Sequence, residues 1–281
     1  MKRVLFLLVI ATAWVGAAGT FHPTLAQPAP AEAESEFEPK VGQEGKDVIW
    51  VPTSQAMVDK MLDMAKVTPQ DNVIDLGSGD GRTVITAAKR GATALGIEYN
   101  PKMVELSQRS AAKEGVGDKA QFRKADLFET DLSQATVITM FLLPEINLQL
   151  RPKILDLKPG TRVVSNSFTM GDWTPDETAE VREGCTSYCK ALLWIVPAKV
   201  EGNWRLPKGE LKIEQNYQTI SGTLKSGKSV QKITDGKVEG DQVTFTAGGT
   251  RYTGRVSEGA IEGTRRTGKK DASWRAVAAR E

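Results

Sequence analysis

Histidine is almost absent from this 281-residue chain, and the single one, His22, lies in a segment with the features of a removable leader. If that segment is removed, no histidine remains. Its loss excludes a histidine-containing hydrolase triad, a histidine-ligated zinc or iron site and an imidazole general base. The two cysteines, Cys185 and Cys189, are too few for an all-cysteine zinc site, so no metal site is expected.

Residues 1–26 follow the order of a secretory signal peptide. Lys2 and Arg3 precede an apolar run over 4–18, and small residues lead up to Ala26. The apolar run is shorter than the roughly 20 residues that a membrane-spanning helix needs. We therefore expect an exported protein, periplasmic or secreted, without a stable membrane span after cleavage; an uncleaved membrane anchor is the lesser alternative.

The small excess of positive charge belongs to this leader. The whole chain carries 37 basic and 35 acidic residues, and both leader charges, Lys2 and Arg3, are basic. The remainder is close to neutral and has no basic stripe interleaved with aromatic residues. The sequence therefore argues against a nucleic-acid partner.

The rest of the chain divides into three parts by composition and periodicity. Residues 27–46 are rich in Pro, Ala and Glu, which predicts a disordered linker. Residues 47–198 alternate expected strands with expected helices, a pattern typical of a parallel sheet covered on both faces. The fold class is α/β, with a Rossmann-like, mostly parallel seven-stranded sheet. Its expected strands are 72–75, 94–97, 120–124, 136–141, 162–166 and the antiparallel pair 177–181 and 191–196.

Residues 199–281 switch to short alternating runs separated by glycine. About seven such runs, between Trp204 and Trp274, predict a small antiparallel β-meander or barrel. They show no catalytic constellation, so a structural or partner-binding role is expected for this part.

The turn after the first expected strand carries the clearest chemical signal. Asp75 ends the strand, and Gly77, Gly79 and Gly81 follow before a helix begins, the context in which nucleotide-binding turns occur. A dinucleotide-binding fingerprint needs glycine where this chain has Arg82. Pyrophosphate oxygens would also be repelled by Asp75 and Asp80, whereas the sulfonium and ammonium groups of S-adenosylmethionine would be attracted. The turn therefore favours S-adenosylmethionine over a dinucleotide.

Two more acidic residues end the next two strands. Glu98 can accept hydrogen bonds from both hydroxyls of a ribose. Asp126 can accept the adenine amino group, with Leu127 packed on the ring. Because ligands of open parallel sheets bind at the carboxyl ends of the strands, we expect these side chains to share one site with Asp75, Gly77 and Gly79.

Over residues 48–198 the chain resembles the class I (seven-β-strand) S-adenosylmethionine-dependent methyltransferases, and most closely the mitochondrial family that methylates the c subunit of ATP synthase on lysine. The cofactor turn at 75–82 is shared by the whole superfamily. The narrower resemblance rests on the stretches 141–150 and 173–176; the Val51-Pro52-Thr53 segment and Phe168 also match. The β-meander is not covered by it.

The resemblance implies methyl transfer to a nucleophilic acceptor, with a protein lysine amine as the suggested case. Phe141, Glu145, Phe168 and Trp173 are the candidate catalytic residues; the aromatic ones, with Trp50, would wall a channel and hold an ammonium by cation–π contact. Deprotonation would come from a desolvated channel, a water chain, or a carboxylate such as Glu145 or Asp172. A related histone lysine methyltransferase has an asparagine pair where this chain has Thr139 and Met140, so histone methylation is not implied.

Three functional hypotheses are compatible with the sequence. The protein is an active exported methyltransferase with an unidentified acceptor, a catalytically inactive exported binding module whose β domain contacts partners, or an enzyme retained in the cytosol by a start downstream of Met1. Cys185 and Cys189 either form a short-loop disulfide or remain free thiols.

Overall fold

A computed structural model describes residues 37–279. The predicted leader and most of the predicted linker lie outside this range. No helix within 37–279 has the length and apolar character that crossing a membrane requires.

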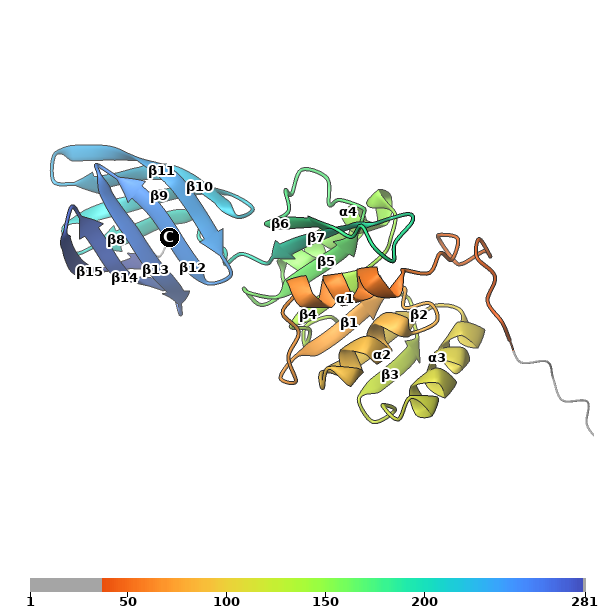
Figure 1. The fold of residues 1–281 in the computed structure, drawn as a ribbon. Coiled ribbons are helices and arrows are strands. Elements are labelled where there is room, and N and C mark those ends of the chain that lie inside the picture. Colours follow the sequence, from red (N-terminus) through yellow and green to blue (C-terminus); the bar gives the residue numbers. More distant parts are fainter. Residues whose placement is uncertain (1–36, 280–281) are drawn as a thin grey trace, which may run out of the picture. The chain divides into compact units, whose positions relative to one another are not determined.

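The residues that the structure describes include four helices (Figure 1). They are α1 (Gln55–Met64), α2 (Arg82–Lys89), α3 (Pro101–Lys113) and α4 (Pro144–Leu155). The Ser54 side chain accepts a hydrogen bond from the Met57 amide at the start of α1, and Asn100 does the same for Lys102 at the start of α3. Pro152 lies inside α4, so this helix lacks one backbone hydrogen-bond donor in its last turns.

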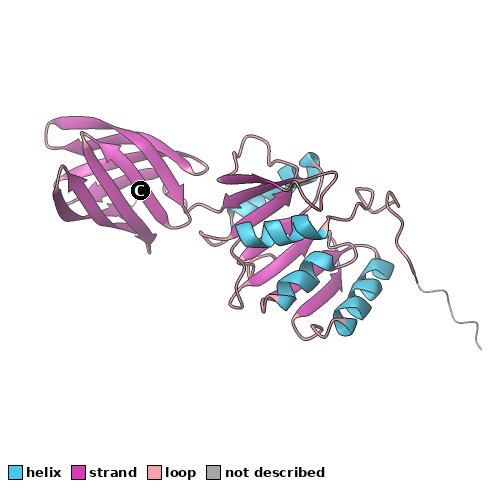
Figure 2. Cartoon of the chain, viewed as in Figure 1, coloured by secondary structure: helices cyan, strands magenta, loops and turns pink. Residues whose placement is uncertain are grey.

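The predicted seven-stranded sheet is confirmed, in the order β3-β2-β1-β4-β5-β7-β6. Figure 2 shows strands in magenta with helices in cyan packed beside them. Its strands are β1 (Asn72–Leu76), β2 (Thr93–Glu98), β3 (Ala120–Lys124), β4 (Val137–Met140), β5 (Arg162–Asn166), β6 (Glu177–Glu180) and β7 (Lys190–Ile195). The first five are parallel, and β7 pairs antiparallel with both β5 and β6. Because β1 lies between β2 and β4, the chain changes direction along the sheet at β1, and a ligand crevice forms at such a point.

Successive residues of the central strands pack on opposite faces of the sheet. Val73 and Val137 join the core formed with α1, α2 and α3. Ile74 and Ile138 join the core formed with α4 on the other face. Burial on both faces explains why these strands are continuous apolar runs.

The loop between β6 and β7 is closed by a disulfide. Cys185 and Cys189 are bonded to each other, which resolves the open alternative in favour of the cross-link. The bond holds a short loop that contains Tyr188, whose side chain is 45% exposed.

Residues 202–278 form a closed antiparallel barrel of eight strands. They are β8 (Gly202–Leu206), β9 (Gly209–Asn216), β10 (Thr219–Ser226), β11 (Ser229–Glu239), β12 (Gln242–Ala247), β13 (Thr250–Ser257), β14 (Ala260–Thr267) and β15 (Lys270–Ala278). The sequence indicated about seven strands and missed β8. That strand is short and pairs with β15 at only two positions, Arg205 with Val277 and Trp204 with Ala278.

Direct contacts join the barrel to the sheet. The Tyr217 ring stacks on Trp173 at 5.8 Å, and its hydroxyl donates a hydrogen bond to Asp172. The Gln218 side chain donates to the Thr174 carbonyl. The sheet and the barrel belong to one compact unit.

Candidate active site

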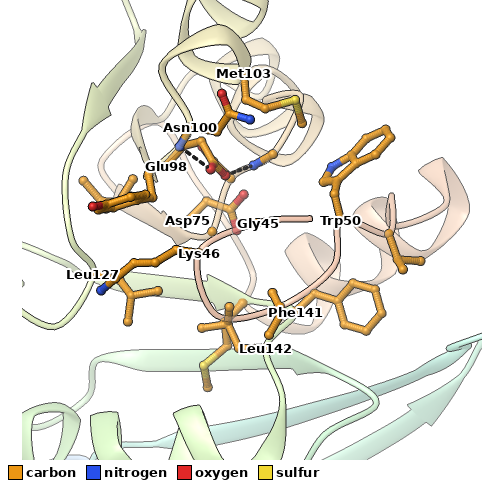
Figure 3. A pocket seen from close by; sticks show the side chains of 18 of the residues that line it. Gly45, Lys46, Trp50, Asp75, Glu98, Asn100, Met103, Leu127, Phe141 and Leu142 are labelled. Atoms are coloured by element: carbon orange, nitrogen blue, oxygen red, sulfur yellow. Dashed lines mark hydrogen bonds between the residues drawn. The ribbon is translucent and has the colours of Figure 1, made fainter. Parts of the chain in front are cut away.

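A cavity of about 120 Å³ lies where β1, β2 and β4 end. Figure 3 shows Asp75 and Glu98 on one side of it, with Trp50 and Phe141 on another. The cavity brings together Asp75, Gly77, Gly79, Glu98, Asp126, Leu127 and Phe141, seven of the residues predicted from the sequence.

The glycine turn approaches its neighbours more closely than a side chain would allow. Gly79 has a φ of 54°, and a Cβ atom there would lie 2.5 Å from the Trp50 ring nitrogen. Gly81 has a φ of 82° and begins α2; a Cβ atom there would lie 2.7 Å from the Phe122 ring. The turn therefore needs glycine both for its backbone conformation and for the space that it leaves.

Asp75 is a buried carboxylate at the base of the cavity. Its oxygen accepts a 2.6 Å hydrogen bond from the Thr139 hydroxyl, and its residue is only 6% exposed. Burial raises the pKa of Asp75 to about 7, although the Thr139 hydrogen bond opposes the rise. A cation placed against Asp75 would replace part of the hydration that this carboxylate lacks.

Glu98 fixes the turn by accepting two backbone hydrogen bonds, which are the dashed lines in Figure 3. The amide of Gly79 donates to one oxygen at 3.0 Å, and the amide of Asn100 donates to the other at 2.9 Å. Each carboxylate oxygen keeps a further lone pair, so the predicted contact with ribose hydroxyls remains chemically open.

Asp80 does not act as a free anion beside the cavity. Arg82 donates to both of its oxygens, at 2.9 and 3.1 Å from Nε, and also donates to the Thr53 carbonyl. The ion pair weakens the expected attraction between Asp80 and a cationic ligand, although the Asp80 charge still contributes to the raised pKa of Asp75.

A short hairpin preceding α1 covers the cavity. We call residues 42–50 the strap; its ends are joined by hydrogen bonds between Gly42 and Trp50 and between Trp50 and Gln43. Lys46 extends from the strap across the cavity toward Leu127 (Figure 3) and forms a 2.5 Å ion pair with Asp126. Its ammonium also lies 5.2 Å from the centre of the Tyr99 ring.

The strap occupies the place predicted for adenine. Asp126 and Leu127 line the cavity as expected, but Lys46 holds the carboxylate that was assigned to the adenine amino group. The pKa of Asp126 is lowered mainly by that hydrogen bond, and the pKa of Lys46 is raised by it. Lys46 was not predicted as a site residue, because the composition of residues 27–46 indicated a disordered linker.

Three aromatic rings pack against one another beside the cavity. We call Phe141, Phe168 and Tyr188 the aromatic trio. The ring centres of Phe141 and Tyr188 lie 5.0 Å apart, and Phe168 lies 5.8 Å from each of the other two. Phe141 also lines the cavity. Tyr188 was not predicted, and its only sequence signal was its place between the two cysteines.

The loop that carries Phe168 is held in place by buried polar groups. Ser165 donates a 2.7 Å hydrogen bond to the Phe168 carbonyl, and the Asn147 amide donates to the Phe168 and Thr169 carbonyls. Asn147 is fully buried in α4. The bend occurs at Ser167, whose φ is 61°. The ring of Phe168 is therefore presented by a constrained loop.

Four residues predicted for the acceptor site do not line the cavity: Glu145, Phe168, Asp172 and Trp173. Phe168 reaches it only through its contact with Phe141. Trp173 is fully buried between Trp194 and Tyr217, so it packs the core where the sheet meets the barrel. Glu145 is exposed in the first turn of α4. Asp172 is paired with Arg151 and Tyr217, and these hydrogen bonds lower its pKa, which makes it a poor base.

The chemistry of the cavity fits S-adenosylmethionine. A desolvated carboxylate, Asp75, suits a cationic ligand; Glu98 can accept from ribose; and the cradle at Gly79 admits close approach to the backbone. The strand order, with β7 inserted antiparallel between β5 and β6, matches the seven-stranded sheet expected from the resemblance. Fold and site together define a class I S-adenosylmethionine-dependent methyltransferase.

Comparison with known proteins gives the same class of enzyme. The family model for the ANTKMT methyltransferase domain matches residues 75–177. A protein-lysine N-methyltransferase of Saccharolobus islandicus is 46% identical over 140 residues, which cover 49% of this chain and 87% of that protein. The human lysine N-methyltransferase of the ATP synthase c subunit is 38% identical over 128 residues, covering 45% of this chain and 54% of that enzyme. The chain thus spans about half the length of the human protein.

A solved structure gives the same result. An RNA methyltransferase from Salinibacter ruber, in complex with S-adenosyl-L-homocysteine, has 44% sequence identity and a TM-score of 0.50, covering 53% of this chain and 96% of that one. The chain belongs to the family of S-adenosylmethionine-dependent methyltransferases that these relatives represent. It is an enzyme of that family, and its cofactor is S-adenosylmethionine.

Proposed function

We propose that the protein is a protein-lysine N-methyltransferase. The observation that carries this proposal is the aromatic trio, which connects the cofactor cavity at Phe141 with solvent at Tyr188. A lysine side chain is long and cationic, and the trio offers aromatic faces beside the cavity that such a side chain can contact. Relatives described as lysine methyltransferases support the same acceptor. The intact cofactor cavity does not support the alternative of an inactive binding module.

Different residues would bind the cofactor and the acceptor amine. Asp75, Glu98 and the glycine turn would hold the cofactor, which supplies an electrophilic methyl carbon when bound. The trio would align the amine and exclude water from it. Positioning of this kind can supply roughly 7–11 kcal/mol of the activation barrier.

The amine must lose its proton before it can attack. At pH 7 this costs roughly 4–5 kcal/mol for a lysine with its ordinary pKa. No histidine is present in residues 37–279, and Glu145 and Asp172 lie outside the cavity. We propose that desolvation at the aromatic rings outweighs the cation–π attraction and lowers the pKa of the ammonium, so that the proton is released to solvent before the amine is enclosed.

The proposal is tested by supplying the full chain with methyl-labelled cofactor and three classes of acceptor: a protein extract, lysine-containing peptides and total RNA. We expect label on protein, located on lysine by mass spectrometry. Label on RNA alone would contradict the proposal; the RNA arm is included because the Salinibacter ruber relative is described as an RNA methyltransferase.

Two variants of Tyr188 test the aromatic trio. Tyr188→Ala should raise KM for the protein acceptor about tenfold and leave cofactor affinity unchanged, because a cation–π contact contributes about 0.5–2 kcal/mol. Tyr188→Phe keeps the ring and should restore activity. If Tyr188→Ala were as active as the native protein, Tyr188 would have no part in acceptor binding.

We also propose that the protein is exported. The order of charges and apolar residues in 1–26 supports this, and the Cys185–Cys189 disulfide suits an oxidising compartment. N-terminal sequencing of the protein from each cell fraction tests it. Cleavage near Ala26 in an exported fraction is expected, whereas an intact Met1 in the cytosol would refute it.

A further inference from the structure

A second cavity, of about 830 Å³, lies at the rim of the barrel, at the end formed by the β8–β9 turn, and its lining includes both inward-facing and outward-facing side chains. This volume lies within the range of small-molecule sites, roughly 300–1,000 Å³. Eight-stranded barrels can enclose one small ligand. Its apolar lining includes Leu206, Leu224, Tyr252 and Trp274.

An arginine faces into this cavity. Arg265 on β14 is paired with Tyr252 on β13 and with Ala272 on β15. Directly paired residues of neighbouring strands point to the same face, and Tyr252 is a buried core residue of the barrel. Arg265 therefore points inward, yet it is exposed to solvent. The barrel is open at this end.

The cavity opens along the seam between β8 and β15. These strands share only two residue pairs, whereas β14 and β15 share eight. Ser273 and Arg275 on the unpaired part of β15 line the cavity together with Lys208 of the β8–β9 turn. A ligand can therefore enter without separating any paired strands.

The positive charge at this opening is only partly neutralised. Glu262 pairs with Arg275 at 2.9 Å. Among residues 37–279, no acidic group lies within ion-pair distance of Arg265, Lys208 or Lys225, all of which line the cavity. Unpaired cations above an aromatic floor are complementary to a ligand that is anionic at one end and apolar along the rest.

We propose that the barrel binds a single-chain amphiphile with an anionic headgroup, which Arg265 holds while Tyr252, Trp274 and Leu224 contact the chain. This role is independent of methyl transfer. No residue of the cofactor cavity is shared with this one.

The test uses the full chain and the fluorescent probe 11-(dansylamino)undecanoic acid, with cofactor present at saturation to block the other cavity. We expect saturable one-to-one binding that dodecanoate displaces and the neutral dodecanol does not. Dodecyl phosphate serves as a second competitor, which distinguishes a carboxylate from a phosphate headgroup.

Matched arginine variants separate this site from general surface charge. Arg265→Gln should weaken probe binding about tenfold, since it removes the charged hydrogen bonds to the headgroup. Arg251→Gln should have little effect, because Arg251 lies beside Tyr252 on the same strand and points outward. Absence of saturable binding, equal loss in both variants, or displacement by dodecanol as effective as by dodecanoate would each overturn the proposal.

Discussion

Asp75 combines a functional charge with a cost in stability. It is buried beneath the glycine turn, and its pKa is raised from 3.8 to about 7. The folded protein therefore holds this proton over a pH range in which the unfolded chain has released it. The free energy of unfolding therefore falls as the pH rises from about 4 to 7. The loss reaches its full size above the pKa of Asp75 in the folded protein.

Replacing Asp75 with Asn should stabilise the free protein and abolish cofactor binding. The amide oxygen can still accept the Thr139 hydrogen bond, but the desolvated charge is gone. The free energy of unfolding at pH 8 should rise by up to roughly 4 kcal/mol, the equivalent of the pKa shift. Urea unfolding and calorimetric titration with cofactor measure the two effects. If Asp75→Asn bound the cofactor with native affinity, Asp75 would have no part in cofactor binding.

Cofactor affinity should depend on the ionisation of Asp75. A cationic ligand needs the carboxylate charged, so affinity should increase about tenfold from pH 6 to pH 8 and level off above the pKa of about 7. Calorimetric titrations with cofactor across this pH range measure the dependence.

Thr139→Val supplies the control for this pH dependence. The variant removes a hydrogen bond that favours the charged form, so the midpoint should move to higher pH. Titration of the ligand itself is the same in both proteins. Coincident curves would therefore show that Asp75 does not govern the dependence.

At the scale of elements, the strap is the feature that controls access to the cofactor cavity. Its Lys46–Asp126 ion pair and its Trp50 ring against Gly79 leave a cavity of about 120 Å³, below the roughly 300 Å³ of ordinary ligand sites. We therefore expect the strap to move when the cofactor enters.

Lys46→Met should increase cofactor affinity about twofold to fivefold, because Asp126 no longer has to leave an ion pair that is itself weak. Stopped-flow binding should show the change mainly in the association rate. Lys60→Met on α1, away from the cavity, is the matched control. A decrease in affinity would mean instead that Lys46 contributes to the bound state.

At the scale of the whole molecule, the contact between Trp173 and Tyr217 couples the sheet to the barrel. Tyr217 also stacks with Arg151 and hydrogen bonds to Asp172. These contacts explain why Trp173 is buried although its motif resembles an active-site sequence.

Tyr217→Ala should lower the free energy of unfolding by about 1–3 kcal/mol through the lost ring contacts. Scanning calorimetry should show one transition for the native protein and two for the variant, as the barrel and the sheet lose their coupling. Val230→Ala, an exposed change on the barrel, should leave a single transition. Two transitions in the native protein would contradict the coupling.

Local sequence signals predicted the elements well because their causes are local. The buried runs at β1 and β4 and the glycine turn at 77–81 all depend on neighbouring residues. β8 was missed because only Trp204 of its five residues is buried, which leaves too short an alternation to recognise, although the strand pairs with β9 at five positions and with β15 at two.

The sequence by itself determined the α/β fold, the cofactor turn and the acidic ends of the first strands, because alternation, capping and strand-end position are properties of short segments. Only the tertiary structure decided which distant side chains meet. It joined Lys46 to Asp126, brought Tyr188 to Phe141 and buried Trp173 beneath Tyr217. These contacts depend on chain closure over long separations, and no pattern within a short segment contains that information.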